Sequence, residues 1–219
     1  MCSHDKRRVK RCYRFRGQPR TKIMSLPILL FDERRLSPAW GYVFDRGWLK
    51  PAESILSILW RFARENATPG HVIVGEAARE RIDPYQGVNF DQSEIHVEHL
   101  ARSLRVARTT LRAALGPASR TFGMSSHLRW CTTCLNLGYH SVVHQLEVVR
   151  TCPIHASQLR DVCKACNQTS PYRLHARLMD GPYRCSACGV RHGHPLLQKK
   201  LPWRIFNPIT RKRAVLLGY

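Results

Sequence analysis

Four short pairs of cysteine and histidine residues between residues 131 and 188 constrain this chain most strongly. They read CTTC at 131–134, CPIH at 152–155, CKAC at 163–166 and CSAC at 185–188. Two residues between the members of a pair let one tight turn direct both side chains at a single ion, and tetrahedral zinc needs two such turns. Eight candidate ligands therefore predict two zinc ions (Zn2+). We expect both ions to be structural, because four protein ligands leave no open coordination position.

The spacing between the pairs favours ligation by sequential neighbours. The first and second pairs are separated by 17 residues, the second and third by 7, and the third and fourth by 18. Sequential pairing closes two loops of nearly equal length, whereas a cross-braced pairing as in RING domains would require a much shorter gap after the histidine. The predicted ligands are Cys131, Cys134, Cys152 and His155 for one zinc, and Cys163, Cys166, Cys185 and Cys188 for the other.

His155 decides whether the first site is closed. It has the same offset from Cys152 as the members of the other pairs have, and Pro153 stiffens the turn between them. Without His155 the ion would have three protein ligands and an open position, which is the arrangement of catalytic zinc. His140 and His144 are alternative fourth ligands, although isolated histidines more often have a core or solvated role. The spacing favours His155 and leaves these alternatives open.

The cysteines also indicate the compartment. The apolar stretch 23–31 follows basic residues, but it contains Pro27 and has no small-residue cleavage site, so we do not interpret it as a signal peptide. No apolar run is long enough to span a membrane. Nine cysteines in a chain that is not exported belong to a reducing cytosol, where grouped pairs indicate metal binding rather than disulfides.

The positive charge is large and concentrated at both ends of the chain. The sequence has 36 Lys and Arg against 15 Asp and Glu, a formal net charge of +21. Such a surplus favours a polyanionic partner, because cations that neutralise phosphates release counterions. We expect a disordered basic arm at 1–23, either native or an upstream extension before Met24, and a basic tail at 196–219. Their candidate nucleic-acid contacts are Arg7, Arg8, Arg11, Arg14, Arg16, Lys199, Lys200, Arg204, Arg211, Lys212 and Arg213.

Apolar periodicity predicts helices upstream of the cysteines. Residues 51–65 carry an apolar stripe that starts after Pro51 and stops at Asn66. Residues 97–116 repeat apolar side chains at steps of three and four, after a start at Asp91 that resembles a capping box. One amphipathic helix or a helix-turn-helix would explain this second pattern.

The finer pattern of 97–116 favours the helix-turn-helix. Small Ala101 suits a close approach of two helices, and Val106 suits a buried turn residue, although Arg105 stands where such turns usually carry glycine. A helix-turn-helix sets the first residues of its second helix against DNA. The predicted contacts there are Arg108, Thr109 and Arg112.

These patterns combine into a mainly α fold with small zinc-ribbon or zinc-knuckle β elements. We expect an arm at 1–23, an N-terminal helical domain with the helix-turn-helix at 24–122, a tandem zinc-finger domain at 123–195 and a tail at 196–219. Acidic residues after Cys131 are few and scattered, whereas a nuclease or transposase needs carboxylates clustered on magnesium. The sequence also lacks a phosphate-binding P-loop. We therefore predict a protein without enzymatic activity.

The segment CTTCLNLGYHSVVHQLEVVRTCPIHASQLRDVCKAC resembles the zinc-binding region of the TniQ family, with its CxxC pair, GYHS turn, CPxH pair and following CxxC pair. AESILSILWRFARENA is similar to the family's ES-xx-S-xx-xR-xA-xxN helix. The matching residues are Glu53, Ser54, Ser57, Arg61, Ala63 and Asn66. Thr132 and Lys164 replace the proline common in such knuckles, and Asn167 replaces a usual glycine. These departures affect loop shape rather than the ligands.

The resemblance implies a target-selection factor of transposons, without nuclease activity. Such proteins connect target DNA or an RNA-guided CRISPR effector to the AAA+ ATPase (TnsC/TniB type) that recruits the transposase. The short chain favours the compact form of CRISPR-associated transposons over a DNA reader such as TnsD. Implied partners are the effector ribonucleoprotein, the ATPase and the backbone of DNA or guide RNA, in the DNA-associated cytoplasm of a prokaryote, with homodimer formation left open. The alternative function is a sequence-specific DNA-binding regulator that uses the helix-turn-helix alone.

Overall fold

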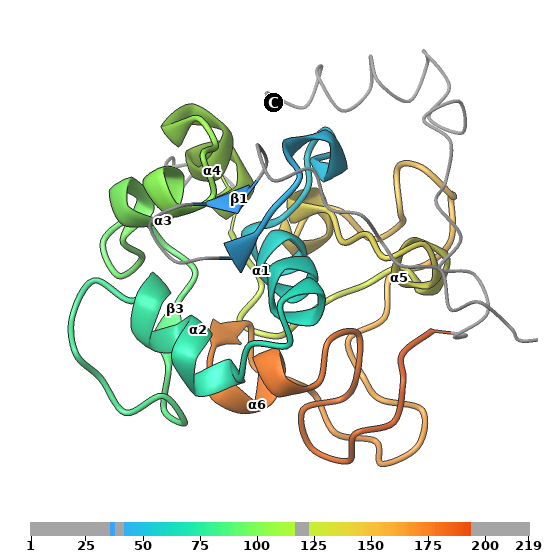
Figure 1. The fold of residues 1–219 in the computed structure, drawn as a ribbon. Coiled ribbons are helices and arrows are strands. Elements are labelled where there is room, and N and C mark those ends of the chain that lie inside the picture. The colour runs from blue at the N-terminus through green and yellow to red at the C-terminus, as the bar shows by residue number, and fades with distance from the viewer. Residues whose placement is uncertain (1–35, 38–41, 117–122, 194–219) are drawn as a thin grey trace, which may run out of the picture. The chain divides into compact units, whose positions relative to one another are not determined.

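A computed structural model describes residues 36–37, 42–116 and 123–193, and these are mainly helical with small pieces of sheet (Figure 1). The helices are α1 (Ile55–Glu65), α2 (Gly70–Ala77), α3 (Val97–Ser103), α4 (Arg108–Leu115), α5 (Thr132–Asn136) and α6 (Ala176–Asp180), with 3-10 helices η2 (Arg46–Trp48) and η3 (Val142–Gln145). The strands β1 (Leu36–Ser37) and β2 (Tyr42–Val43) form one antiparallel pair, and β3 (Val88–Asn89) and β4 (Arg173–Leu174) form another. None of the helices in this part of the chain has the length and apolarity needed to cross a membrane.

Helix α1 supplies the centre of the core. Its residues from Ile55 to Ala63 are all buried. The helix begins after Ser54, whose hydroxyl accepts a hydrogen bond from the N–H of Ser57, and it ends at Asn66. The predicted start at Pro51 was therefore too early, because the serine cap, rather than the proline, satisfies the free N–H groups of the first turn.

Residues 97–115 form two helices, so the single long helix weighed as an alternative is excluded. Between α3 and α4 the backbone of Arg105 adopts a φ of 51°, a left-handed conformation that breaks the helix. Asp91 does not cap α3: its carboxylate accepts hydrogen bonds from the N–H groups of Ser93 and Glu94 and closes a turn before the helix begins. The predicted helix start was wrong because a short Asp side chain also stabilises an isolated turn.

Helix α2, which the sequence patterns did not reveal, packs against α6 (Figure 1). The contact is close at Gly70, whose N–H donates a 2.6 Å hydrogen bond to the Asp180 carboxylate. A Cβ at Gly70 would lie 2.8 Å from that carboxylate oxygen and closer still to the carbonyl oxygen of Ala176. Only glycine allows this approach, since the backbones of the two helices touch there.

One hydrophobic cluster extends from Phe44 to Tyr183 and draws on both the upstream helices and the cysteine-rich region. The indole N–H of Trp60 on α1 donates a 2.7 Å hydrogen bond to the carbonyl of Leu178 on α6, and its ring lies 4.9 Å from that of Tyr183. The cysteine-rich region therefore contributes to this core, whereas Cys131, Cys134 and Cys152 belong to a separate buried cluster with Tyr139. The domain boundary placed between residues 122 and 123 stays a prediction.

Candidate metal centres

The eight candidate ligands gather into two groups of four, and in each group the ligand atoms lie within 4.8 Å of one another. The first holds Cys131, Cys134, Cys152 and His155, and the second holds Cys163, Cys166, Cys185 and Cys188. The grouping follows the sequential order of the pairs, and each group could hold a zinc ion.

The distances within the groups fit tetrahedral zinc. The sulfurs of Cys134 and Cys152 are 3.6 Å apart, and those of Cys163 and Cys188 are 3.7 Å apart. The Nδ1 atom of His155 lies 3.5 Å from the sulfur of Cys131. Zinc bonds of the usual length place tetrahedral ligand atoms about 3.5–3.8 Å apart. The donor set suits zinc, and these three distances match a tetrahedral site, whereas the Cys134 sulfur lies only 3.2 Å from Nδ1 of His155 and would move apart from it around a bound ion.

Three of the four pairs share one backbone turn. The N–H of the residue four positions after Cys152, Cys163 or Cys185 donates to the carbonyl of that cysteine, at 2.8–2.9 Å. Each of the residues that donate these hydrogen bonds has a left-handed backbone conformation, with φ of 51° at Ala156, 55° at Asn167 and 73° at Gly189. Asn167 replaces the glycine usual in the family, and asparagine is one of the few residues that adopt this conformation at low cost. The repeated turn directs both ligands of a pair inward.

The first pair is built on a helix instead. Cys131 caps α5, and Cys134 lies within it, with the N–H of Leu135 bonded to the Cys131 carbonyl at 3.0 Å. Thr132, which stands where the family often has proline, occupies the first helical position, where either residue is accommodated. This pair therefore anchors its metal centre to a helix rather than to a loop.

The electrostatic surroundings of the ligands favour a bound cation. Hydrogen bonds to Cys134 and Cys152 lower the pKa of the Cys131 thiol, and the contact with Cys131 raises the pKa of His155 to about 9. In the second group burial opposes ionisation of Cys163, but the N–H groups of Ala165 and Cys166 outweigh it and bring its pKa to about 7. Negative charge is thus stabilised on Cys131 and Cys163, whereas the contact with these neighbouring thiols raises the pKa of Cys134 and Cys166, so one sulfur of each close pair carries the charge first.

The two groups differ in exposure. All three cysteines of the first group are buried, with Tyr139 packed against them. In the second group Cys188 is exposed and Cys166 is half-buried. The first centre therefore belongs to the packed interior, whereas the second faces solvent.

His140 and His144, the alternative fourth ligands, are core residues outside both groups. His140 is bonded at both ring nitrogens: Nδ1 lies 2.7 Å from the Ser54 hydroxyl, and Nε2 lies 2.8 Å from the Arg129 carbonyl. His144 comes no closer than 3.9 Å to the sulfur of Cys134. Burial lowers the pKa of His140 to about 4 and that of His144 to about 3, so both rings are neutral at pH 7.

The two motifs that carry the family resemblance contact each other. The N–H of Ser54, at the start of α1, donates to the carbonyl of His140 at 2.9 Å, and the His140 N–H donates to the hydroxyl of Ser57 at 3.2 Å. Ser141 completes the contact through its hydroxyl, which donates to the Ala52 carbonyl at 3.0 Å. The GYHS turn is thus fixed to the first turn of α1. Sequence reasoning identified both motifs, but it did not predict that they form one buried polar network.

Three further motif residues stabilise the same region. Glu53 is buried, accepts a 2.7 Å hydrogen bond from Ser57 and forms an ion pair with Arg61. Burial raises the pKa of Glu53, and Arg61 opposes that rise. Asn66 exchanges hydrogen bonds with the backbone of Val43, at 2.7 and 2.8 Å. These polar side chains have a structural role, because each pairs with a buried or half-buried polar group.

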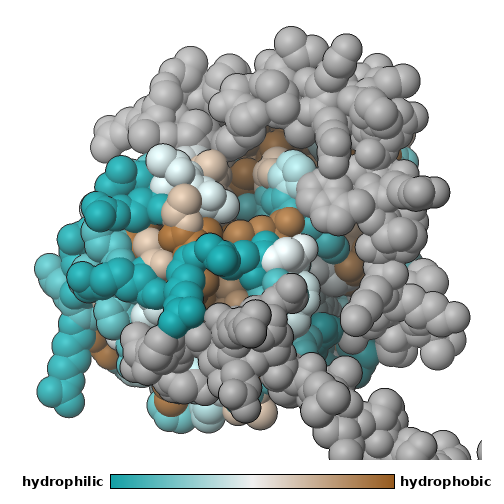
Figure 2. All heavy atoms as spheres, turned by 45° about the horizontal axis from the view of Figure 1, so that its top comes forward, coloured by the Kyte–Doolittle hydropathy of each residue, from teal (hydrophilic) through white to brown (hydrophobic). Residues whose placement is uncertain are grey.

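The predicted nucleic-acid contacts are only partly within the described residues. Arg108, Thr109 and Arg112 are exposed on α4, and the guanidinium of Arg112 donates to Glu98 at 3.1 Å. In Figure 2 hydrophilic side chains cover the left side of the described surface, next to hydrophobic atoms near its centre. The arm and tail candidates lie outside the described residues, namely Arg7, Arg8, Arg11, Arg14, Arg16, Lys199, Lys200, Arg204, Arg211, Lys212 and Arg213. Nucleic-acid binding by all of these residues stays a prediction.

Comparison with known proteins identifies the family. The sequence model of TniQ matches residues 48–159, a span that includes α1, the GYHS turn and the whole first ligand group. A comparison with curated proteins gave no match. With half of the chain matched, and with the two motifs joined in one network, we conclude that this chain belongs to the TniQ family of transposition proteins.

Proposed function

We propose that this protein is a non-enzymatic adaptor of transposition. It connects a target-recognising component, either an RNA-guided CRISPR effector or target DNA, to the AAA+ ATPase that recruits the transposase, and so directs DNA insertion. Family membership carries this proposal. The TniQ match centres on residues that hold the fold together, which is what a rigid connector between two partners requires.

The metal centres support a scaffolding role. Each ligand group offers four protein donors, so a bound zinc ion would be closed to water and substrate. We propose that both ions are structural and that the eight cysteine and histidine residues are their ligands. Zinc bound in such sites contributes about 10–16 kcal/mol to folding. Binding surfaces on the cysteine-rich region would then depend on metal for their shape.

Helices α3 and α4 form the second functional surface of the proposal. We interpret them as a helix-turn-helix, because the turn at Arg105 sets the exposed first residues of α4, Arg108 and Thr109, toward solvent. Arginine and threonine at the start of a second helix are residues that contact DNA in such motifs. With the basic ends of the chain, this surface would contact DNA or guide RNA backbones.

The adaptor proposal is tested by association with the ATPase. Zinc-loaded protein should retain an AAA+ ATPase of the TnsC/TniB type in a pull-down, and addition of an RNA-guided effector ribonucleoprotein should bring all three into one complex. A zinc-loaded Gly75→Ala variant is a suitable control and should retain the ATPase as the wild type does, because Gly75 is exposed and an added Cβ would meet nothing within 4 Å. Failure to retain the ATPase with and without nucleic acid would overturn the adaptor role.

The exposed cationic start of α4 also favours a second candidate, a sequence-specific DNA-binding regulator. That function predicts tight binding to one duplex at physiological salt, with a dissociation constant of about 10⁻⁸ M or lower. The adaptor predicts weaker binding that is indifferent to sequence and depends steeply on salt. Titration against random and selected duplexes at two salt concentrations separates the two.

A further inference from the structure

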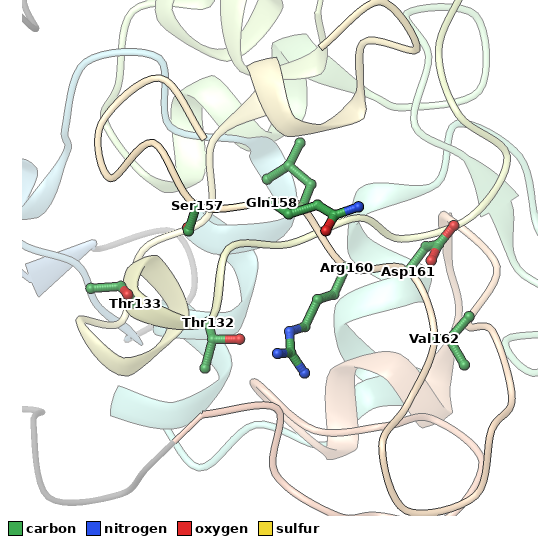
Figure 3. Close-up of a pocket in the computed structure, with 8 residues that line it drawn as sticks. Thr132, Thr133, Ser157, Gln158, Arg160, Asp161 and Val162 are labelled. Carbon is green, nitrogen blue, oxygen red and sulfur yellow. The ribbon is translucent and has the colours of Figure 1, made fainter. Parts of the chain in front are cut away.

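A pocket of about 440 Å³ lies beside the first ligand group (Figure 3). Two segments supply its polar wall: Thr132 and Thr133 come from α5, and Ser157 and Arg160 come from the extended chain after His155. None of these side chains is a metal ligand candidate, and none belongs to the network around α1. The pocket is therefore a feature that neither the metal centres nor the core explains.

The pocket wall is tied to the first ligand group through contacts with the candidate ligands themselves. Thr132 and Thr133 stand between the candidate ligands Cys131 and Cys134. On the other side the hydroxyl of Ser157 lies 3.2 Å from the sulfur of Cys131, and its carbonyl accepts a 2.7 Å hydrogen bond from the N–H of Cys152. Both segments are thus tied to the same ligand group, and closure of that group preforms the pocket.

Arg160 and Asp161 are the charged residues that line the pocket, and Arg160 supplies its positive charge. Its backbone exchanges two hydrogen bonds with Trp130, at 2.7 and 2.8 Å, so its side chain leaves from a fixed position. Within the described part of the chain, the side chains of Arg160, Thr132 and Thr133 form no ion pair or hydrogen bond. In Figure 3 the hydroxyl of Thr132 points toward the guanidinium, whereas the carboxylate of Asp161 points away from it. Asp161 also lines the pocket, but neighbouring residues of an extended segment alternate in direction, and its carboxylate forms no ion pair with Arg160 among the described residues.

This combination suits one class of ligand. A guanidinium with hydroxyl groups beside it is a frequent protein contact to phosphate oxygens in nucleic-acid complexes. The apolar part of the wall is limited to Leu159 and Val162, too little for the side chains of a peptide or an apolar ligand. We propose that this pocket binds a phosphodiester group of a nucleic-acid strand, with Arg160 as the ionic contact and Thr132 and Thr133 as hydrogen-bond donors. The inference rests on the proposed function only in that a nucleic acid is a partner.

The test measures binding of fluorescently labelled oligonucleotides by anisotropy, with single-stranded DNA, single-stranded RNA and duplex DNA as separate probes. Arg160→Gln should weaken binding about tenfold, and the slope of log affinity against log salt should fall by about one, as expected for loss of one phosphate contact. Thr132→Val removes a hydroxyl without changing charge and should weaken binding about threefold. Arg150→Gln is the matched control, because Arg150 is an exposed cation on the neighbouring segment that does not line the pocket.

Each variant is first shown to bind zinc as the wild type does and to melt at the same temperature. Equal weakening by the Arg160 and Arg150 substitutions, with Thr132→Val unchanged, would show that only net charge matters and would overturn the proposal. So would binding of an oligoglutamate peptide, but of no oligonucleotide, at the same pocket. Retention of the ATPase without any nucleic-acid binding would refute the pocket and leave the adaptor role standing. If the protein does not retain the ATPase but Arg160→Gln still weakens oligonucleotide binding, the adaptor role is refuted and the pocket stands.

Discussion

Replacement of Gly70 by alanine should destabilise the protein because it separates α2 from α6. The added Cβ would lie 2.8 Å from an Asp180 carboxylate oxygen and nearer to the Ala176 carbonyl. Ordinary contacts between carbon and oxygen begin at about 3.3 Å, so α6 must move by half an ångström or more. Overpacking of this kind costs about 1–3 kcal/mol. The same movement weakens the 2.6 Å hydrogen bond between Gly70 and Asp180, and bonds to charged groups contribute about 1.5–3 kcal/mol.

We therefore expect Gly70→Ala to lower the free energy of unfolding by about 3 kcal/mol and the melting temperature by about 6–12 °C. Gly75→Ala lies on the same helix, where an added Cβ would meet nothing within 4 Å, and should raise stability by up to about 1 kcal/mol. Urea and thermal unfolding of the zinc-saturated proteins measure both. Equal stability of the two variants would refute the close contact of α2 with α6 and the shared core that depends on it.

Three further predictions concern the metals and the buried network. Metal analysis should find two zinc ions in the wild type and one in each of His155→Ala and Cys185→Ser, and an unchanged count in either variant would contradict its ligand group. Ser54→Ala removes the cap of α1 and leaves Nδ1 of His140 without its partner, so it should cost about 2–4 kcal/mol in urea unfolding; a loss below about 0.5 kcal/mol would contradict the network. Because the folded pKa of His140 is about 4, below the ordinary value of 6.5, its contribution is complete above pH 6.5 and is lost as the pH falls toward 4. Between pH 7 and pH 5 it should account for about 2 kcal/mol, and His140→Asn should show a correspondingly shallower dependence of stability on pH.

The ligand set was accessible from the sequence because it is a local property. A cysteine pair with two intervening residues needs only one turn to aim both donors, and the turn depends on a few neighbouring residues. Ala156, Asn167 and Gly189 adopt the same left-handed backbone at the same offset in three pairs. Helix α1 was predictable for a related reason, since its apolar stripe repeats with the helical period.

Boundaries and missed elements show where local patterns fail. Pro51 and Asp91 both carry signals of helix starts, yet Ser54 caps α1 and Asp91 closes a separate turn. A short polar side chain can accept a hydrogen bond from a nearby N–H group in an isolated turn as well as at a helix start. Tertiary packing therefore decides which of the two structures forms. Helix α2 is short, and its contact with α6 at Gly70 depends on residues more than 100 positions away.

The sequence by itself determined that the chain has two groups of candidate metal ligands, a mainly helical upstream region and a strong positive charge, because spacing, periodicity and composition are read along the chain. Tertiary structure alone decided that Ser54 meets His140, that Glu53 is buried with Arg61, and that a hydroxyl-lined pocket opens at Arg160. The physical reason is that buried polar groups must find partners, and for Ser54 and His140 that partner is 86 positions away. No periodicity reports such a pairing, so only the folded chain reveals that the two family motifs are parts of one network.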